Sequence, residues 1–311
     1  MPFLVVCLNP TLQKTLCYPS ITLDAVNRTA VHRIDASGKG MNVTRALAQL
    51  GKNVVHLTHL GRDLRPYFLS LCAEDNLSVE WVESGSQIRL CYTVLTENDS
   101  GVTELVEEPQ PVSAGTEKLL LEKFNSLLGL DFTCLIISGT KARGYSDEVI
   151  PFMVRKAKEK GLAVILDVKG KDLQGSLQYK PDLVKPNLFE FASTFAPELI
   201  KENVLIADAA RVKERIEPVM RGLVSQYGCR VILTDGGRKI YAACANAFFE
   251  VEPQRVKAVN STGCGDAFAA GFAVAMENLD TKTLSGFREA ILEGCRCGAL
   301  NAGLLRPGVV K

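Results

Sequence analysis

Short apolar runs of strand length alternate with longer amphipathic stretches along the 311-residue chain, and this alternation constrains the fold more than any other feature. Helical spacing of apolar residues marks Met41–Leu50, Glu117–Leu128 and Ser146–Lys160. Several strand-like runs are apolar at consecutive positions, as expected for strands covered on both faces. Alternating β and α elements predict an α/β fold with a doubly wound, mostly parallel sheet and helices on both faces. The six predicted strands are Phe3–Leu8, Val54–Leu60, Thr133–Ser138, Ala163–Asp167, Leu183–Val184 and Val231–Thr234.

One segment departs from this pattern. Between Ile88 and Val94, apolar side chains alternate with more polar ones, and the turn sequence Asn98–Gly101 separates them from Val102–Val106. This arrangement predicts a β-hairpin whose two faces differ, with Arg89 on the face opposite the apolar one. Residues 11–35 are polar and rich in turns. We predict a small β-sheet lid from 11–36 and 85–108, and an α/β core from 1–10, 37–84 and 109–311.

The charge balance argues against nucleic acid or an anionic membrane as a partner, because 36 Lys and Arg face 35 Asp and Glu. The first apolar run lacks the basic flank of a signal peptide and is interpreted as a strand. No apolar run reaches the length of a membrane span. The ten cysteines are scattered, and Cys295 and Cys297 are too close together for the usual zinc spacing. These features predict a cytoplasmic globular protein with free thiols.

A glycine-rich stretch, Asn260–Asp266, precedes a run that is apolar on every side, Ala267–Met276. Such a run predicts a helix buried all round. The first turn of that helix would present free backbone N–H groups and the positive end of the helix dipole, which together form an anion site. Asp266 could there accept a proton from a hydroxyl group. Alternatively, Asp266 only caps a core helix.

Three further clusters lie at turns. Ser37–Val43 carries a cation, Lys39, and an amide, Asn42, which could meet a phosphate and sugar hydroxyls; the cluster could equally be only a turn before a helix. Asn187 and Glu190 have the spacing of a capping box, and the glutamate could instead lie near a hydrated magnesium ion. Thr234–Gly237 is either a turn or a nucleotide phosphate loop.

In their order along the chain, these clusters resemble the ribokinase-like, phosphofructokinase-B sugar kinases. Ser37–Arg45 is similar to the N-terminal signature of that family. Asn260–Ala273 is similar to its C-terminal signature, which contains the catalytic aspartate and the anion hole. Asn187–Glu190 resembles its magnesium and phosphate motif. The resemblance covers essentially the whole chain.

Finer details resemble one branch, the tagatose-6-phosphate kinases and 1-phosphofructokinases. They are the lysine of Gly38–Gly40 and the segments Leu8–Leu12, Asp24–Arg28 and Thr103–Glu107. This chain departs from the branch at Gln13, where an aspartate usually binds sugar hydroxyls.

Three more departures lie near the expected site. Thr140–Gly144, with Lys141 and Arg143, replaces the usual loop after Gly139, and its two cations could meet a phosphate or simply be solvated. The loop Thr234–Arg238 also differs from the usual nucleotide loop. Cys264 is a small substitution that leaves its backbone N–H unchanged.

The resemblance implies ATP-dependent phosphorylation of a ketohexose phosphate, with Asp266 as general base and Mg²⁺ bound with ATP. The helix end would also lower the pKa of Asp266 and keep it ionised. The implied residues are Gly263, Cys264 and Gly265 for the anion hole; Lys39, Arg89 and Arg28 for the sugar's phosphate; Gln13, Gly38 and Asn42 for its hydroxyls; Lys185, Asn187, Thr234, Gly236 and Gly237 for ATP; and Glu190, through water, with Asn187 for magnesium.

Two other functions stay open: a kinase of an unphosphorylated sugar or nucleoside, and a sugar-phosphate-binding regulator without catalysis. A dinucleotide oxidoreductase is disfavoured, because no Gly-x-Gly-x-x-Gly follows the first strand. The lid would cover the sugar site, and its open hairpin edge predicts a homodimer formed through the lid. The sequence leaves tagatose-6-phosphate, fructose-1-phosphate and fructose-6-phosphate as candidate sugars.

Overall fold

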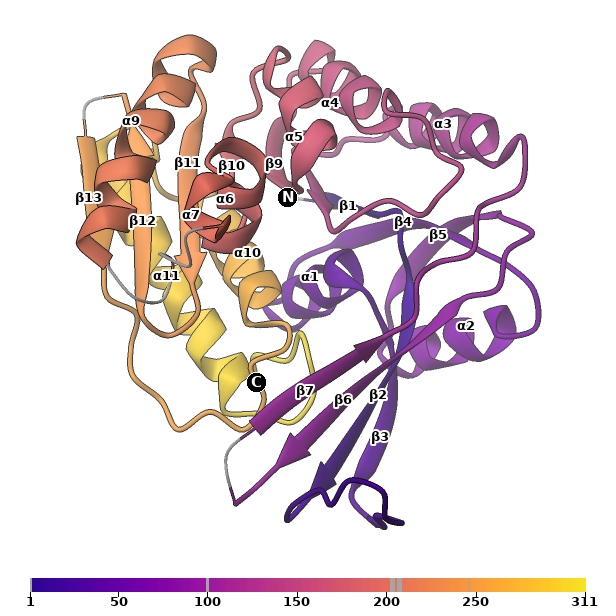
Figure 1. The fold of residues 1–311 in the computed structure, drawn as a ribbon. Helices are drawn as coiled ribbons and strands as arrows, with labels where there is room; N and C mark the ends of the chain where they lie inside the picture. Colours follow the sequence, from indigo (N-terminus) through magenta and orange to yellow (C-terminus); the bar gives the residue numbers. More distant parts are fainter. Residues whose placement is uncertain (1, 99–100, 202–204, 206–208, 246) are drawn as a thin grey trace.

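The computed structural model describes residues 2–98, 101–201, 205, 209–245 and 247–311. Its main sheet has nine strands in the order β13-β12-β11-β10-β9-β8-β1-β4-β5 (Figure 1). In this spatial order, every neighbouring pair of strands from β11 across to β5 is parallel. At the other edge, β12 pairs antiparallel with β11, and β13 pairs antiparallel with β12. The prediction of a mostly parallel sheet is confirmed. The strands are β1 (Phe3–Cys7), β4 (Val54–Leu60), β5 (Ser78–Glu83), β8 (Cys134–Ser138), β9 (Ala163–Asp167), β10 (Leu183–Val184), β11 (Arg230–Asp235), β12 (Lys239–Cys244) and β13 (Ala247–Val251).

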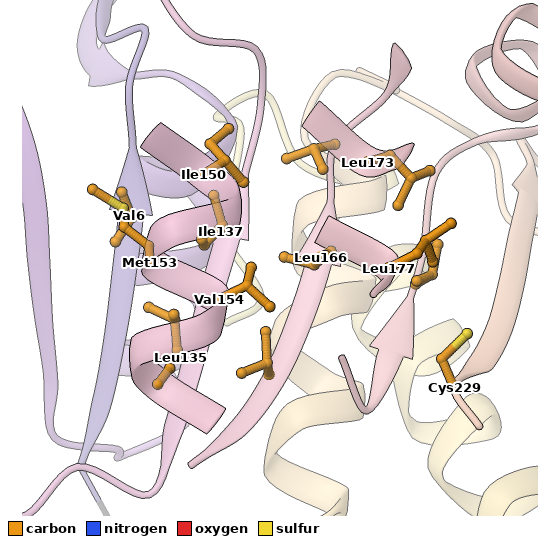
Figure 2. Packing of buried hydrophobic residues seen from close by; sticks show 14 of the residues in the cluster. Val6, Leu135, Ile137, Ile150, Met153, Val154, Leu166, Leu173, Leu177 and Cys229 are labelled. Carbon is orange, nitrogen blue, oxygen red and sulfur yellow. The ribbon is translucent and has the colours of Figure 1, made fainter. Parts of the chain in front are cut away.

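Helices cover both faces of this sheet, because alternate residues of each central strand point to opposite faces. Leu4 and Val6 of β1 belong to the core under α3, α4, α5, α6 and α9, whereas Phe3 and Val5 belong to the core under α1, α10 and α11. Figure 2 shows Met153 of α4 packed over the first of these faces. The helices are α1 (Lys39–Gln49), α2 (Arg65–Glu74), α3 (Thr116–Leu127), α4 (Val149–Glu159), α5 (Gly170–Leu177), α6 (Leu188–Phe195), α7 (Glu198–Lys201), α9 (Ala209–Tyr227), α10 (Cys264–Ala275) and α11 (Leu284–Ala302).

The predicted helices occur with shifted ends. Helix α1 begins at Lys39, two residues before the predicted start, because Gly38 adopts a left-handed φ of 112° that lets the chain turn directly into the helix. Helix α4 begins three residues later than predicted. The N-cap residue is Glu148, without a side-chain capping bond, and Ser146 lies before the helix, where its hydroxyl donates to Glu117 and accepts from the Glu148 N–H over 3.3 Å. Helix α10 is buried along most of its length, as its uniform apolar sequence predicts.

A second sheet of four strands lies apart from the main one, at the bottom of Figure 1, in the order β3-β2-β6-β7. Strands β6 and β7 form the predicted hairpin, but Asp99 and Ser100 of its turn lie outside the described residues. Strand β2 joins β6 in parallel and β3 antiparallel, so residues 11–37 contribute half of this sheet. The division of the chain into core and lid segments stays a prediction. The strands are β2 (Thr11–Tyr18), β3 (His32–Ser37), β6 (Arg89–Thr96) and β7 (Gly101–Val106).

None of the helices in the described part of the chain combines the length and the apolar character that crossing a bilayer requires.

Candidate functional site

A cavity of about 1210 Å³ lies between the second sheet and the carboxyl ends of the parallel strands. Ligand pockets of drug size occupy about 300–1,000 Å³, so this cavity has room for two substrates side by side. All but one of the predicted site residues line it. They are Gln13, Gly38, Lys39, Asn42, Arg89, Lys185, Asn187, Glu190, Thr234, Gly236, Gly237, Gly263, Cys264, Gly265 and Asp266.

Asp266 lies in the first turn of α10 and is 5% exposed. The side-chain amide of Asn42, on α1, donates to Asp266 Oδ2 over 2.8 Å. Burial, followed by the nearby carboxylate of Asp167, raises the pKa of Asp266 from its usual 3.8 to about 6. Lys39, Asn42 and Lys185 act in the opposite direction without overcoming that rise. The expectation that the helix end lowers this pKa is therefore wrong, because the cost of burying the charge is larger.

The turn before α10 is shaped by Gly263, which has a left-handed φ of 85°. A Cβ atom at Gly263 would lie 2.8 Å from the backbone nitrogen of Gly308, so only glycine fits there. Of the three N–H groups predicted to form an anion hole, that of Cys264 already donates to the Ser261 carbonyl over a long 3.3 Å. Gly265 faces the Lys185 ammonium, which would lie 3.7 Å from an added Cβ.

Two lysines and two carboxylates form an ion cluster behind this turn, in which the Lys39 side chain is 36% exposed and the other three are at most 12% exposed. Lys39 Nζ lies 2.8 Å from Glu190 Oε1 and 3.4 Å from Asp167 Oδ1. Lys185 Nζ lies 3.3 Å from Asp167 Oδ2, and both of these side chains are 2% exposed. Burial opposes the charge of Lys39, but Asp167 and Glu190 outweigh it and raise the lysine's pKa. Burial likewise opposes the charge of Asp167, but Lys185 and Lys39 hold that pKa below its usual range.

Asp167 was not predicted as a site residue. It is the last residue of β9, and ligands of open α/β sheets bind at the carboxyl ends of strands. A carboxylate at a predicted strand end was therefore a usable signal.

The helix-capping alternative for Asn187 and Glu190 is confirmed. Asn187 Oδ1 accepts from the Glu190 N–H over 2.7 Å, and Glu190 Oε2 accepts from the Asn187 N–H over 3.1 Å. The other oxygen of Glu190 still reaches Lys39, so capping leaves the carboxylate turned to the cavity. Asn187 also forms a parallel bridge with Thr234, which places the two predicted nucleotide segments next to each other.

Among the described residues, no group of three or more His, Cys, Asp or Glu side chains could hold a metal ion by itself. Two carboxylates are nevertheless close together, and Mg²⁺, which keeps several of its waters, is commonly bound through only one or two carboxylates. Glu190 and Asp167 converge on the ammonium of Lys39 from two different elements, and carboxylate oxygens are the ligands that Mg²⁺ prefers.

The second sheet supplies polar groups from the opposite wall. Gln13 on β2 is buried and donates to Thr93 Oγ1 on β6 over 2.7 Å. Arg89, at the start of β6, donates through Nη1 to the Glu107 carbonyl, while its buried Nε has no hydrogen-bond partner among the described residues. Thr262 Oγ1 donates to Glu104 on β7 over 3.3 Å and joins this sheet to the turn before α10.

Three predicted or candidate cations are not brought to the cavity. Arg28 lies exposed in the connection between β2 and β3 and does not line the cavity. Lys141 forms ion pairs with Asp147 and Asp172 instead. Arg143 is exposed and also lies outside the cavity lining.

Solved structures with similar folds span nearly the whole chain at low identity. A protein described as a possible 1-phosphofructokinase from Thermotoga maritima matches with a TM-score of 0.84 at 17% identity, over 98% of this chain and 93% of that one. Phosphofructokinase-2 from Escherichia coli, in a tetrameric inhibited form, matches with a TM-score of 0.79 at 21% identity. That match covers 97% of this chain and 93% of that one. A ribokinase from Thermotoga maritima matches with a TM-score of 0.69 at 19% identity, over 98% of this chain and 94% of that one.

These likenesses identify the fold. The family follows from a sequence comparison, in which residues 16–305 match the pfkB family carbohydrate kinases. The match spans both of the glycine-rich turns that border the cavity, together with the ion cluster between them. The chain therefore belongs to the pfkB carbohydrate kinase family and is a sugar kinase.

Proposed function

We propose that this protein transfers the γ-phosphoryl group of ATP to a ketohexose phosphate: tagatose-6-phosphate, fructose-1-phosphate or fructose-6-phosphate. The observation that carries the proposal is the pairing of Asp266 with Asn42 at the start of α10, in one cavity with basic and amide side chains from both walls. A carboxyl group whose pKa is about 6 is a base near neutral pH, and it takes up a proton more readily than an exposed aspartate.

The sugar phosphate would lie between the second sheet and α1. The unpaired Nε of Arg89 and the ammonium of Lys39 supply positive charge for its phosphate group. Gln13, Gly38 and Asn42 line the same part of the cavity and would hold the hydroxyls. The reacting hydroxyl gives its proton to Asp266, and its oxygen keeps the electron pair for attack on phosphorus.

ATP would occupy the other half, along Thr234, Gly236 and Gly237, where β11 ends in a glycine turn. The N–H groups of Gly263 and Gly265, with Lys185 behind them, would stabilise charge on the transferring group. Glu190, through water, and Asn187 would hold Mg²⁺, which neutralises phosphate charge when it is bound with ATP.

We also propose a homodimer formed through the second sheet. Strands β3 and β7 are its edges, and β7 exposes apolar side chains, among them Leu105 at 57%. An exposed strand edge with apolar side chains is a template for pairing with a second copy.

A substrate panel tests the proposed activity. With Mg²⁺ and ATP, we expect ADP release to depend on a ketohexose phosphate, and the product to be a bisphosphate by mass spectrometry. The three candidate sugars are compared with free fructose, tagatose, ribose and adenosine. ADP release with free sugars or adenosine alone would instead support the kinase of an unphosphorylated acceptor. If no acceptor led to ADP release, the sugar-phosphate-binding regulator without catalysis would be the remaining function.

Lys39→Ala tests the assignment of the phosphate contact. We expect KM for the sugar phosphate to rise about 10- to 100-fold, the worth of a hydrogen bond to a charged group, with little change for an unphosphorylated sugar. Lys52→Ala is the matched control, because Lys52 pairs with Glu277 outside the cavity. Steady-state kinetics on both variants make the comparison. An equal loss on both classes of sugar would mean that Lys39 does not contact the sugar's phosphate.

A further inference from the structure

Arg45, on α1, is a fully buried cation to which the proposed reaction gives no role. Its guanidinium donates to four acceptors. Nε reaches Asp75 Oδ2 at 3.0 Å, and Nη2 reaches the Ala36 carbonyl at 2.5 Å. Nη1 is shared between the Pro307 carbonyl at 3.1 Å and Asn42 Oδ1 at 3.3 Å. The last contact links Arg45 to the partner of Asp266.

The side-chain amide of Asn42 is polarised by its neighbours. Its nitrogen donates to Asp266, and its oxygen accepts from Arg45 and lies 3.0 Å from the hydroxyl of Ser37. A hydroxyl can donate or accept, so Ser37 is compatible with either orientation of the amide. A guanidinium can only donate. Arg45 therefore allows only one orientation of the Asn42 amide, with the oxygen toward the guanidinium, whether Asp266 is ionised or protonated.

We propose that Arg45 is a positioning residue that holds the Asn42 amide with its nitrogen toward Asp266 at every stage of the reaction. This inference rests on the proposed function in one respect: the proposed reaction supplies the proton that Asp266 accepts. Because Oδ2 of Asp266 stays occupied by the Asn42 N–H, the proton taken from the sugar hydroxyl goes to Oδ1. Without Arg45, the amide can turn when Asp266 is protonated and accept a hydrogen bond from it, which stabilises the protonated form.

Arg45 is itself held in place by an ion network that ends on the second sheet. Asp75 also pairs with Arg306, and Arg306 Nε lies 2.7 Å from Asp35 Oδ1 on β3. The network therefore contains a second arginine, Arg306, which is close to Arg45 but is joined to it through Asp75. This pair allows the effect of charge to be separated from the effect of amide orientation.

The test measures the ionisation of Asp266 directly, in the protein without substrate. Carbon-13 labelling of aspartate carboxyls and an NMR titration report the pKa, and the Asp266→Asn variant assigns the signal. In Arg45→Gln, whose amide can donate or accept, we expect the pKa of Asp266 to rise by about one unit, equivalent to one hydrogen bond to a charged group. Arg45→Lys, which can only donate and lies three residues from Asn42 on the helix, should restore the original value to within a few tenths.

Arg306→Gln is the charge control, because it removes a cation from the same network without touching Asn42. It should leave the pKa unchanged. The other titratable groups that act on or respond to Asp266 are Asp167, Lys39, Lys185, Cys7 and Cys264, and they are the same in all variants. An unmoved pKa in Arg45→Gln, or an equal rise in Arg306→Gln, would overturn the proposal.

If Arg45→Gln does not fold, Arg45→Met tests the same point. Methionine fills irregular buried space, and Asp75 keeps its pairing with Arg306 in that variant. The titration does not depend on turnover. The pKa can therefore respond as expected in a protein that phosphorylates no ketohexose phosphate, and in that case only the proposed function fails.

Discussion

Replacing Asp266 by asparagine should lower kcat about 10²- to 10⁴-fold, the usual worth of a general base. Asparagine keeps the shape of the side chain and can still accept the hydrogen bond from Asn42, but it cannot take the proton of the attacking hydroxyl. ATP affinity should change little, because the proposed nucleotide residues lie on other elements. ADP formation and a separate measurement of ATP binding would check both halves of the expectation. Turnover equal to that of the wild type would remove Asp266 from the reaction.

The same variant has an internal control for folding. The pKa of Asp266 is raised in the folded protein, so its effect on stability depends on pH. Below the unfolded pKa of 3.8 the carboxyl is protonated in both states and costs nothing. As pH rises from 3.8 to about 6, the unfolded chain releases this proton while the folded protein keeps it, so the free energy of unfolding falls by up to roughly 3 kcal/mol, at about 1.4 kcal/mol per pKa unit. The loss is complete once the pH is above about 6. Asp266→Asn should therefore be at least as stable as the wild type at pH 8.

Urea unfolding at pH 4 and pH 8 measures this difference. We expect the variant's advantage to be larger at pH 8, where the wild-type carboxylate is ionised. The alternative that Asp266 caps α10 is wrong, because Gly263 is the N-cap residue and no side chain forms a capping hydrogen bond there. A variant that is inactive and also less stable at pH 8 would mean that Asp266 supports the fold in another way. A variant that is inactive but more stable would fit a residue kept for chemistry at a cost in stability.

Sequence alone predicted the mostly parallel sheet, and the features of the site that it predicted are local ones. Gly263, Gly38 and the uniform apolar run of α10 each specify a conformation within a few residues, and the structure has those conformations. The same holds for the capping pair of Asn187 and Glu190, for which both alternatives could be stated because the spacing defines them.

What the sequence could not give are quantities set by distant neighbours. The pKa of Asp266 depends on burial and on Asp167, which is 99 residues earlier in the chain, and the local helix dipole predicted the wrong sign. The amide of Asn42 is oriented by Arg45, whose own position depends on the C-terminal segment through the Pro307 carbonyl. Arg28 was expected near the substrate because it lies in a motif, but tertiary structure leaves its loop exposed.

Asp167→Asn should have the largest effect on stability, lowering the free energy of unfolding by about 3–5 kcal/mol, as is typical when one partner of a buried ion pair is removed. The change keeps the size of the side chain and removes only its charge. Lys185, which is 2% exposed, would then be left buried with no carboxylate at 3.3 Å, and Lys39 would keep only Glu190. Urea unfolding at pH 7 gives the value.

Asp147→Asn provides a matched control, because Asp147 also pairs with two lysines. Its oxygens lie 2.9 Å from Lys141 and 3.5 Å from Lys171, but it is 58% exposed. An exposed ion pair contributes little to stability, so the control should lose little. Similar losses in the two variants would mean that burial does not amplify the interaction around Asp167.

A double variant separates the value of the ion pair from the cost of an unpaired charge. In Asp167→Asn with Lys185→Met, no cation is left buried without a partner, so most of the stability should return. Activity should not return, because Lys185 is also proposed to stabilise the transferring phosphoryl group beside Gly265. If stability and turnover recovered together, the cluster would be structural, and the residues that stabilise the transferred charge would have to be sought elsewhere in the cavity.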